Sequence, residues 1–333
     1  MLAEDADATS VTTAQWILTV QRATGALAIR DRPGRMLVDG IVPHGGRRFT
    51  MAEALGAKKS GAWPVSILEQ ADQPVIKAER LGERVRLSVH ATYRLPVPAA
   101  LAEAAPKGAA AQPDDLLPAG EANHIASPGR PGRPGNNGGA AVASEQVLVG
   151  GYTLEINGKG AIAVSYAYRP LAPGAIVSEA GLSMVAPAGM AEFRWVGQGP
   201  YAGYPGKDQL NEFGIYHLNR ADLRFQGNRR QTELAVLSDT AGAGFALALP
   251  AADVAVERHG ARTLLSHNAV IGGLGNKGTQ PETVVALDKV GEISGRFLLL
   301  PLGGAWPQAL QGWVGAPGAA GEVLKPFWHS YDQ

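Results

Sequence analysis

Hydrophobic residues recur at every second position along much of this 333-residue chain. The clearest run spans residues 85–95, where apolar side chains alternate with Arg, Ser, His and Thr. A period of two places alternate side chains on opposite faces of a β-strand, so this run predicts a strand with one buried and one solvated face. Similar runs lie at 152–156 and 162–168. Asn157-Gly158 between them favours a tight hairpin, because both turn positions need positive φ.

The rest of the chain repeats this pattern of short strands and turns. Thr24-Gly25 separates two further runs, 16–21 and 26–30. More strands are expected near 191–196, 231–238, 244–249, 261–266, 283–289 and 292–300. Helical signals are confined to residues 51–58 and 307–312, too short to build an α/β fold. We therefore predict an all-β fold of stacked antiparallel sheets.

Residues 97–145 differ in composition from the strand-forming segments. They are rich in Ala, Pro and Gly and cannot bury enough apolar surface to offset the entropy of ordering. We expect a flexible surface insertion in a single domain, 1–333, that ends in an irregular tail at 303–333. The alternative is a linker between two domains, 1–96 and 146–333.

The charge balance and the absence of cysteine exclude several classes of function. Lys and Arg together number 30, as do Asp and Glu, so no net field attracts nucleic acid or an anionic membrane. With no cysteine, a disulfide, a thiolate metal site and a cysteine nucleophile are excluded. No His pair has metal-ligand spacing, and we expect neither a metal nor a cofactor. The sequence has no signal-peptide pattern and no apolar stretch of about 18 residues, so we expect a cytoplasmic or periplasmic protein without a membrane span.

Three blocks resemble segments of one known family, and they occur in that family's order. They are Phe193-Arg194-Trp195-Val196-Gly197-Gln198-Gly199-Pro200 with Tyr204-Pro205-Gly206-Lys207-Asp208, then Arg224–Leu234, and then Ser266–Gly273. They resemble the C-terminal domain, or separate small chain, of family 2 β-galactosidases. Residues 16–27 resemble the opening strands of that domain. The resemblance implies a large galactose-mutarotase-like supersandwich whose hydrolytic glutamates belong to a separate barrel domain or large subunit.

The sequence departs from the family pattern at two places that bear on sugar binding. Gln226-Gly227-Asn228 replaces an "ENG" segment, and the loop 274–281 contains no aromatic residue where the family has a sugar-stacking Trp.

The candidate substrate-binding residues lie in or near these blocks. They are Tyr204, Asp208, Arg230, Glu233, His267, Asn276 and Lys277. Asp208 follows the Tyr-Pro turn and could equally cap backbone N–H groups. Glu233 is expected to face solvent or a cleft on its strand, and His267 could serve a general acid–base reaction or be structural. Asn276 and Lys277 lie in the loop after the third block. Trp306, Trp313 and Trp328 could stack on sugar or fix the tail to the sandwich.

These features lead to three hypotheses for function. The first is a carbohydrate-binding accessory domain or small subunit of a β-galactosidase-like hydrolase, with carbohydrate and a catalytic barrel as partners and no catalytic residue assigned in this chain. The second is a stand-alone mutarotase, epimerase or glycosidase. The third is a polysaccharide-binding module without catalysis.

Overall fold

The fold was described from a computed structural model. The described residues are 1–46, 68–94, 146–157, 160–171, 176–177, 179–221, 227–259, 261–272, 285–286 and 289–303. The predicted insertion, the helices expected at 51–58 and 307–312, and the three C-terminal Trp residues lie outside these ranges. Across the described ranges every element is a β-strand, which confirms the all-β prediction. None of those elements is a helix long and apolar enough to cross a bilayer.

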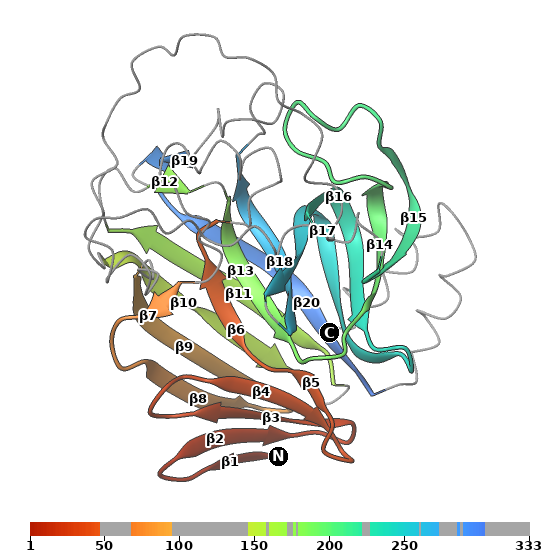
Figure 1. Cartoon of the computed structure of the whole chain (residues 1–333). Helices are drawn as coiled ribbons and strands as arrows, with labels where there is room; N and C mark the ends of the chain where they lie inside the picture. Colours follow the sequence, from red (N-terminus) through yellow and green to blue (C-terminus); the bar gives the residue numbers. More distant parts are fainter. Residues whose placement is uncertain are drawn as a thin grey trace, which may run out of the picture.

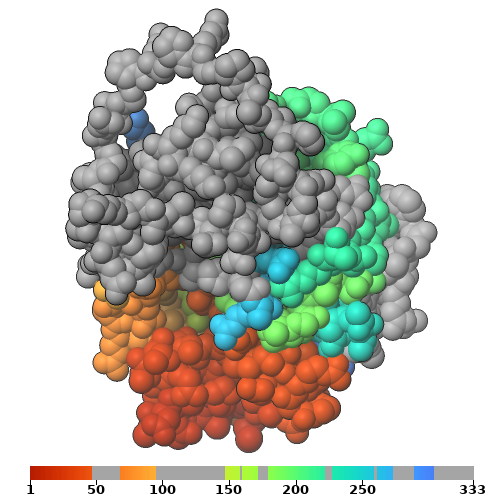
Figure 2. Space-filling view, in the orientation of Figure 1, coloured from red at the N-terminus to blue at the C-terminus, as the bar shows by residue number. Residues whose placement is uncertain are grey.

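The first five strands form a separate antiparallel sheet, in the order β1-β2-β3-β4-β5. They are β1 (Leu2–Glu4), β2 (Ala8–Thr12), β3 (Trp16–Gln21), β4 (Leu27–Asp31) and β5 (Met36–Val38). The predicted hairpin at Thr24-Gly25 joins β3 to β4, and Gly25 has a φ of 67°. Figure 1 shows this sheet beneath β8 and β9, and Figure 2 shows it forming the base of this face of the molecule.

A 13-stranded antiparallel sheet makes up most of the molecule. Its main path runs β15-β14-β16-β17-β20-β11-β10-β9-β7, with β8 paired to β9, and with β13 joining β6 to β18 beside β17. The strands on the N-terminal side are β6 (Ile41–His44), β7 (Glu69–Gln70), β8 (Val75–Leu81), β9 (Arg84–Arg94), β10 (Gln146–Ile156) and β11 (Ile162–Pro170). The remaining strands are β13 (Glu179–Ala186), β14 (Glu192–Gly199), β15 (Glu212–Asn219), β16 (Gly227–Ser238), β17 (Ala243–His259), β18 (Arg262–Ile271) and β20 (Ile293–Gly303). A short pair, β12 (Ile176–Val177) with β19 (Val285–Ala286), lies outside it.

The main hydrophobic core lies between the five-stranded sheet and the 13-stranded sheet. Trp16, Leu18 and Ile29 of the first sheet share one buried cluster with Leu87 and Leu154 of the second. The indole Nε1 of Trp16 also donates a hydrogen bond to the carbonyl oxygen of Gly160, at 2.8 Å. The residues predicted to face inward on β9, β10 and β11 therefore do so, because alternation directs them toward the first sheet.

A second apolar cluster covers the opposite face of the large sheet. It comprises Val196, Leu234, Val236, Ala246, Ala248, Leu298, Leu300 and Leu302. On β20, Leu298 and Leu299 are both fully buried but belong to different clusters. Strands β14, β16, β17 and β20 are therefore buried on both faces, which explains their nearly continuous hydrophobic sequence.

Candidate functional site

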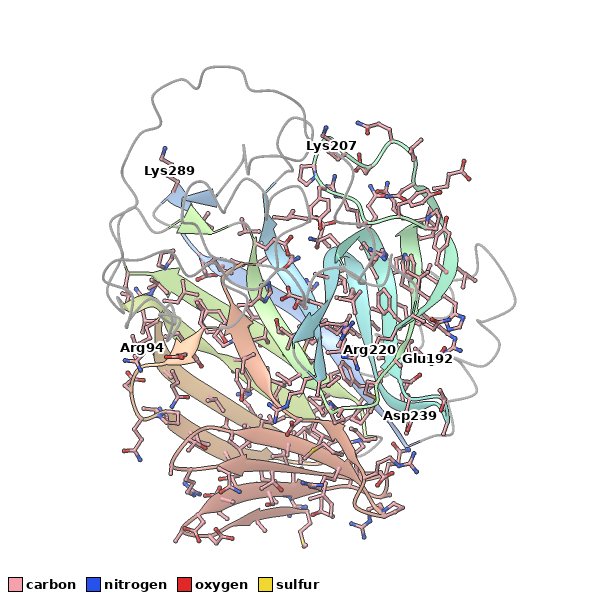
Figure 3. The ribbon with its side chains drawn as sticks, viewed as in Figure 1. Arg94, Glu192, Lys207, Arg220, Asp239 and Lys289 are labelled. Atoms are coloured by element: carbon pink, nitrogen blue, oxygen red, sulfur yellow. The ribbon has the colours of Figure 1, made fainter. Side chains whose placement is uncertain are left out.

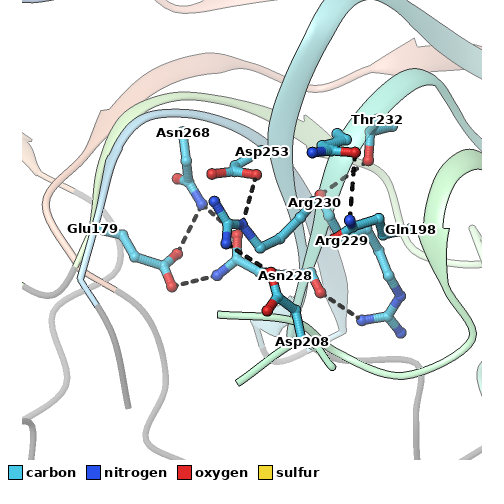
Figure 4. Close-up of polar contacts among 10 residues, drawn as sticks. Glu179, Gln198, Asp208, Asn228, Arg229, Arg230, Thr232, Asp253 and Asn268 are labelled. Carbon is cyan, nitrogen blue, oxygen red and sulfur yellow. Dashed lines mark hydrogen bonds and ion pairs between the residues drawn. The ribbon is translucent and has the colours of Figure 1, made fainter. Parts of the chain in front are cut away.

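A buried polar cluster ties three strands together at one end of the large sheet. Its members are Glu179 on β13, Asn228 on β16 and Asn268 on β18, and Glu179 is only 1% exposed. Asn268 Nδ2 donates to Glu179 Oε2 at 2.9 Å and to Asn228 Oδ1 at 2.7 Å. Asn228 Nδ2 donates to the other carboxylate oxygen of Glu179. Both oxygens of this buried carboxylate therefore accept side-chain hydrogen bonds, as a buried charged group requires (Figure 4).

His44 extends this cluster across β13 to β6. Its Nε2 lies 2.5 Å from Asn268 Oδ1, and its Nδ1 lies 2.9 Å from the Ser183 hydroxyl. The Asn268 oxygen can only accept, so Nε2 carries the proton and Nδ1 accepts from Ser183. Ser183 in turn accepts from Ser266 at 2.7 Å. Burial lowers the pKa of His44 to about 4, so the ring is neutral near pH 7. A neutral ring is required by the hydrogen-bond chain that runs from Ser266 through Ser183 and His44 to Asn268.

His267 lies in the core beside this chain. Its Nδ1 is 2.6 Å from the hydroxyl of Tyr166, and its ring is 5.5 Å from that of Phe297. Burial, and to a lesser extent the nearby His44, lowers the pKa of His267 to about 4. A Cβ at Gly295 would come within 2.5 Å of His267 Cε1, so only glycine leaves room for the imidazole. The structure thus places this candidate residue in the core.

The solvent-accessible part of the site is an arginine between two carboxylates. Arg230 Nη1 lies 2.8 Å from Asp208 Oδ2, and Arg230 Nε lies 3.4 Å from Asp253 Oδ1. The side chains of Arg230, Asp208 and Asp253 are 27%, 25% and 18% exposed. Asp253 is the register partner of Asn268, so this ion-pair group borders the buried cluster (Figure 4).

Local backbone strain helps to place Arg230. The register between β16 and β17 shifts between Arg229 and Thr232 and again before Leu234. Gln231 and Ala251, on the two strands at these shifts, have φ values of 49° and 52°. Positive φ is unfavourable for residues other than glycine and is concentrated at functional sites. The bulge lets buried Arg229 be followed by half-buried Arg230.

The loop after β14 closes over this region. The N–H of Gly203 donates to the Asn228 carbonyl at 2.9 Å, and a Cβ at Gly203 would meet Arg230 Cγ at 3.3 Å. Tyr204 is 4% exposed and anchors the loop, and its backbone pairs with that of Lys207. Lys207 lies at the far end of β14 and β16 from Asp239 (Figure 3).

Among the predicted site residues, the structure therefore brings Asp208 and Arg230 into contact, and Tyr204 lies in the loop that carries Asp208. Glu233 is half-buried on β16, at the second register shift. Asn276 and Lys277 lie outside the described residues. Five residues of this region were not predicted from the sequence, namely Glu179, Asn228, Asn268, His44 and Asp253. A signal existed for Glu179, which is a charged residue at the start of an otherwise apolar segment, Glu179–Ala186.

Arg229 has a different role from its neighbour Arg230. It is fully buried, and its guanidinium carbon lies 4.8 Å from the centroid of the Trp195 ring. Trp195 also stacks with Phe193 and with Tyr216. Arg229 therefore supports the packing of β14 against β16, and only Arg230 of this pair is placed to meet a ligand.

A cavity of about 550 Å³ lies elsewhere, lined by residues of both large sheets that include Leu27, Tyr93 and Tyr152. None of its lining residues belongs to the buried cluster or to the ion-pair group. Among the described residues, the buried Tyr152 hydroxyl has no hydrogen-bond partner.

The site consists of neutral amides and one arginine flanked by carboxylates. These groups offer hydrogen-bond donors and acceptors in fixed positions, which suits a ligand with several hydroxyl groups. Among the described residues, no group of three or more His, Asp or Glu side chains could hold a metal ion.

Comparison with known families finds a similarity over part of the chain. Residues 139–271 match the model for the beta galactosidase small chain. No curated protein matches this sequence.

One similar solved structure is a putative aldose 1-epimerase from Escherichia coli K12, with 8% identity over 87% of this chain and 97% of that chain and a TM-score of 0.41. Another is galactose 1-epimerase from Lactobacillus acidophilus NCFM, with 8% identity over 90% and 96% and a TM-score of 0.39. A TPR-domain protein from Parabacteroides distasonis ATCC 8503 has 4% identity over 90% of this chain and 48% of that chain, with a TM-score of 0.42.

The fold and the site thus define an all-β protein with a polar site at the end of a large antiparallel sheet. Residues 139–271, which contain β13, β14, β16 and β18, are similar in sequence to the beta galactosidase small chain family. This match confirms the resemblance seen in the first two blocks and in most of the third.

Proposed function

We propose that this chain is a carbohydrate-binding accessory domain or small subunit of a β-galactosidase-like glycoside hydrolase. In this role it forms one wall of a sugar site, and the hydrolytic carboxylates belong to another domain or chain. The match of residues 139–271 to the small-chain family supports this role. The observation that carries it is the half-buried Asp208–Arg230–Asp253 group beside the Glu179 amide cluster.

The chemistry of this group favours binding over bond cleavage. A retaining glycosidase needs a protonated carboxyl group and a nucleophilic carboxylate about 5–5.5 Å apart. Asp208 and Asp253 are instead both engaged by the same guanidinium, and Glu179 is held by two amides. Oxygen atoms oriented in this way accept hydrogen bonds from sugar hydroxyl groups, while Arg230 donates to the ring or hydroxyl oxygens.

Calorimetric titration with galactose and lactose tests binding directly. The Arg230→Ala variant should weaken binding at least tenfold, because hydrogen bonds to charged groups contribute about 1.5–3 kcal/mol. Arg194→Ala is a matched control, because Arg194 is also 27% exposed and ion-paired but lies beside Glu192, away from the site. Equal affinities in wild type and Arg230→Ala would refute this site.

Hydrolysis of an aryl β-galactoside tests the accessory role. The purified chain should show no turnover by itself, and turnover should appear when it is combined with a family 2 barrel domain that lacks its own small chain. Turnover by the chain alone that disappears in Arg230→Ala would overturn the accessory role and favour a stand-alone enzyme.

A further inference from the structure

An exposed aromatic residue lies in the loop that closes over the ion-pair group. Tyr201 is 47% exposed, although most aromatic side chains of the described strands are buried. Its N–H donates to Asn211 Oδ1 at 2.9 Å, and the Asn211 N–H donates to the Asp208 carbonyl at 2.9 Å. Two short links therefore connect Tyr201 to Asp208, one of the two carboxylates that hold Arg230.

The loop that carries Tyr201 has little freedom to move relative to the site. Gly203 is bonded to the backbone of Asn228, and a Cβ there would lie 3.4 Å from Asp208 Cβ. A Cβ at Gly227 would lie only 2.8 Å from Ala202 Cβ. Ala202 and Gly203, which follow Tyr201, are thus packed against the start of β16, and this fixes the backbone of the loop next to the polar group.

Two other exposed apolar side chains near Tyr201 have different surroundings. Leu210 is 82% exposed and is aliphatic. Phe213 is 49% exposed and is the register partner of Gln198 on β14. Alternation places Phe213 with Ile215 and Val196 on the face of the second apolar cluster. In the loop between β14 and β15, residues 200–211, Tyr201 is therefore the exposed aromatic residue.

We propose that Tyr201 is a sugar-stacking residue, against which the C–H face of a pyranose packs while the hydroxyl groups of the sugar reach Arg230 and Asp208. This inference rests on the proposed function, since it assumes a sugar at the ion-pair group. An aromatic ring supplies apolar contact area at low conformational-entropy cost, and a pyranose has one face made largely of C–H groups. The ligand class is a glycoside whose terminal pyranose presents such a face, as β-galactosides do.

Calorimetry with methyl β-galactoside and lactose provides the test. Tyr201→Ala should weaken binding about threefold to tenfold, the range expected for loss of one aromatic contact. Tyr201→Phe should retain wild-type affinity, because the ring and not the hydroxyl makes the contact. Leu210→Ala and Phe213→Ala remove exposed apolar groups nearby and should leave the affinity unchanged.

Saturation-transfer NMR adds a readout that a structural defect would not reproduce. In the wild type, the C–H protons of one face of the methyl β-galactoside ring should receive the strongest saturation, and Tyr201→Ala should abolish that preference. Unchanged affinity in Tyr201→Ala, or an equal loss in Tyr201→Phe, would overturn the stacking role while leaving the proposed function standing. No sugar binding by the wild type would instead refute the proposed function.

Discussion

Acidification should destabilise this protein through two buried histidines. Burial lowers the pKa of both His44 and His267 from 6.5 to about 4 in the folded state. Between these values the unfolded chain binds protons that the folded chain does not, so the free energy of unfolding rises with pH across this window. The stabilisation is complete above about pH 6.5 and is lost as the pH falls toward 4.

The size of the effect follows from the two pKa values. For one histidine whose pKa changes from 6.5 to about 4 on folding, lowering the pH from 7 to 5 costs about 2 kcal/mol. Two such residues give a ceiling of about 4 kcal/mol, which is a large fraction of a typical domain stability of about 5–15 kcal/mol. Protonation would also break the hydrogen-bond chain from Ser266 to Asn268, because His44 Nδ1 could no longer accept a hydrogen bond from Ser183.

Urea unfolding at several pH values between 7 and 5 provides the assay. The wild type should lose stability with falling pH, and His44→Gln should show about half of that dependence. His267→Gln is a second variant in case the first does not fold, and His90→Gln controls for replacing an exposed histidine on a strand. The reasoning is refuted if the wild type is equally stable at pH 7 and pH 5, or if both core variants keep the full pH dependence.

Two further predictions concern the sheet and the cluster. Leu298→Ala and Leu299→Ala should each cost about 2–5 kcal/mol in the free energy of unfolding, because both side chains are fully buried on opposite faces of β20. A negligible cost for Leu298→Ala in chemical denaturation would contradict burial of the second face. Asn268→Ala should cost about 1–3 kcal/mol for each buried polar group that loses its hydrogen bond to Asn268, among them Asn228 Oδ1 and His44 Nε2. Denaturation matching that of the wild type would argue against the cluster.

The alternation of apolar residues predicted the half-buried strands well. Strands β9, β10 and β11 each have one face on the core, so their period of two is visible in the sequence. Strand β13 was not predicted, because all eight of its residues are buried and no polar face marks it. A strand buried on both faces has no such alternation.

Strand β17 shows a second limit of sequence reasoning. The sequence predicted a strand only near 244–249. Pro250 follows this segment, and proline normally ends a strand or lies at an edge. In the structure the strand continues to His259 through Ala251, whose φ is 52°. The register shift at this point brings Asp253 opposite Asn268 and within reach of Arg230. Local propensity gives no sign of such a bulge, so Asp253 could not be predicted as a site residue.

The same strands hold the buried cluster and the exposed ion-pair group, and this arrangement bears on how the site would bind a ligand. Arg230 lies two residues after Asn228 on β16, and Asp253 lies opposite Asn268 across the β17–β18 ladder. Hydrogen bonds to Glu179 fix the positions of both Asn side chains, and therefore of the strand segments that carry Arg230 and Asp253. Side chains held in this way lose little conformational entropy when a ligand binds, which raises affinity without adding a contact. A substitution such as Asn268→Ala should accordingly weaken sugar binding, even though residue 268 is buried beneath the surface that the sugar would meet.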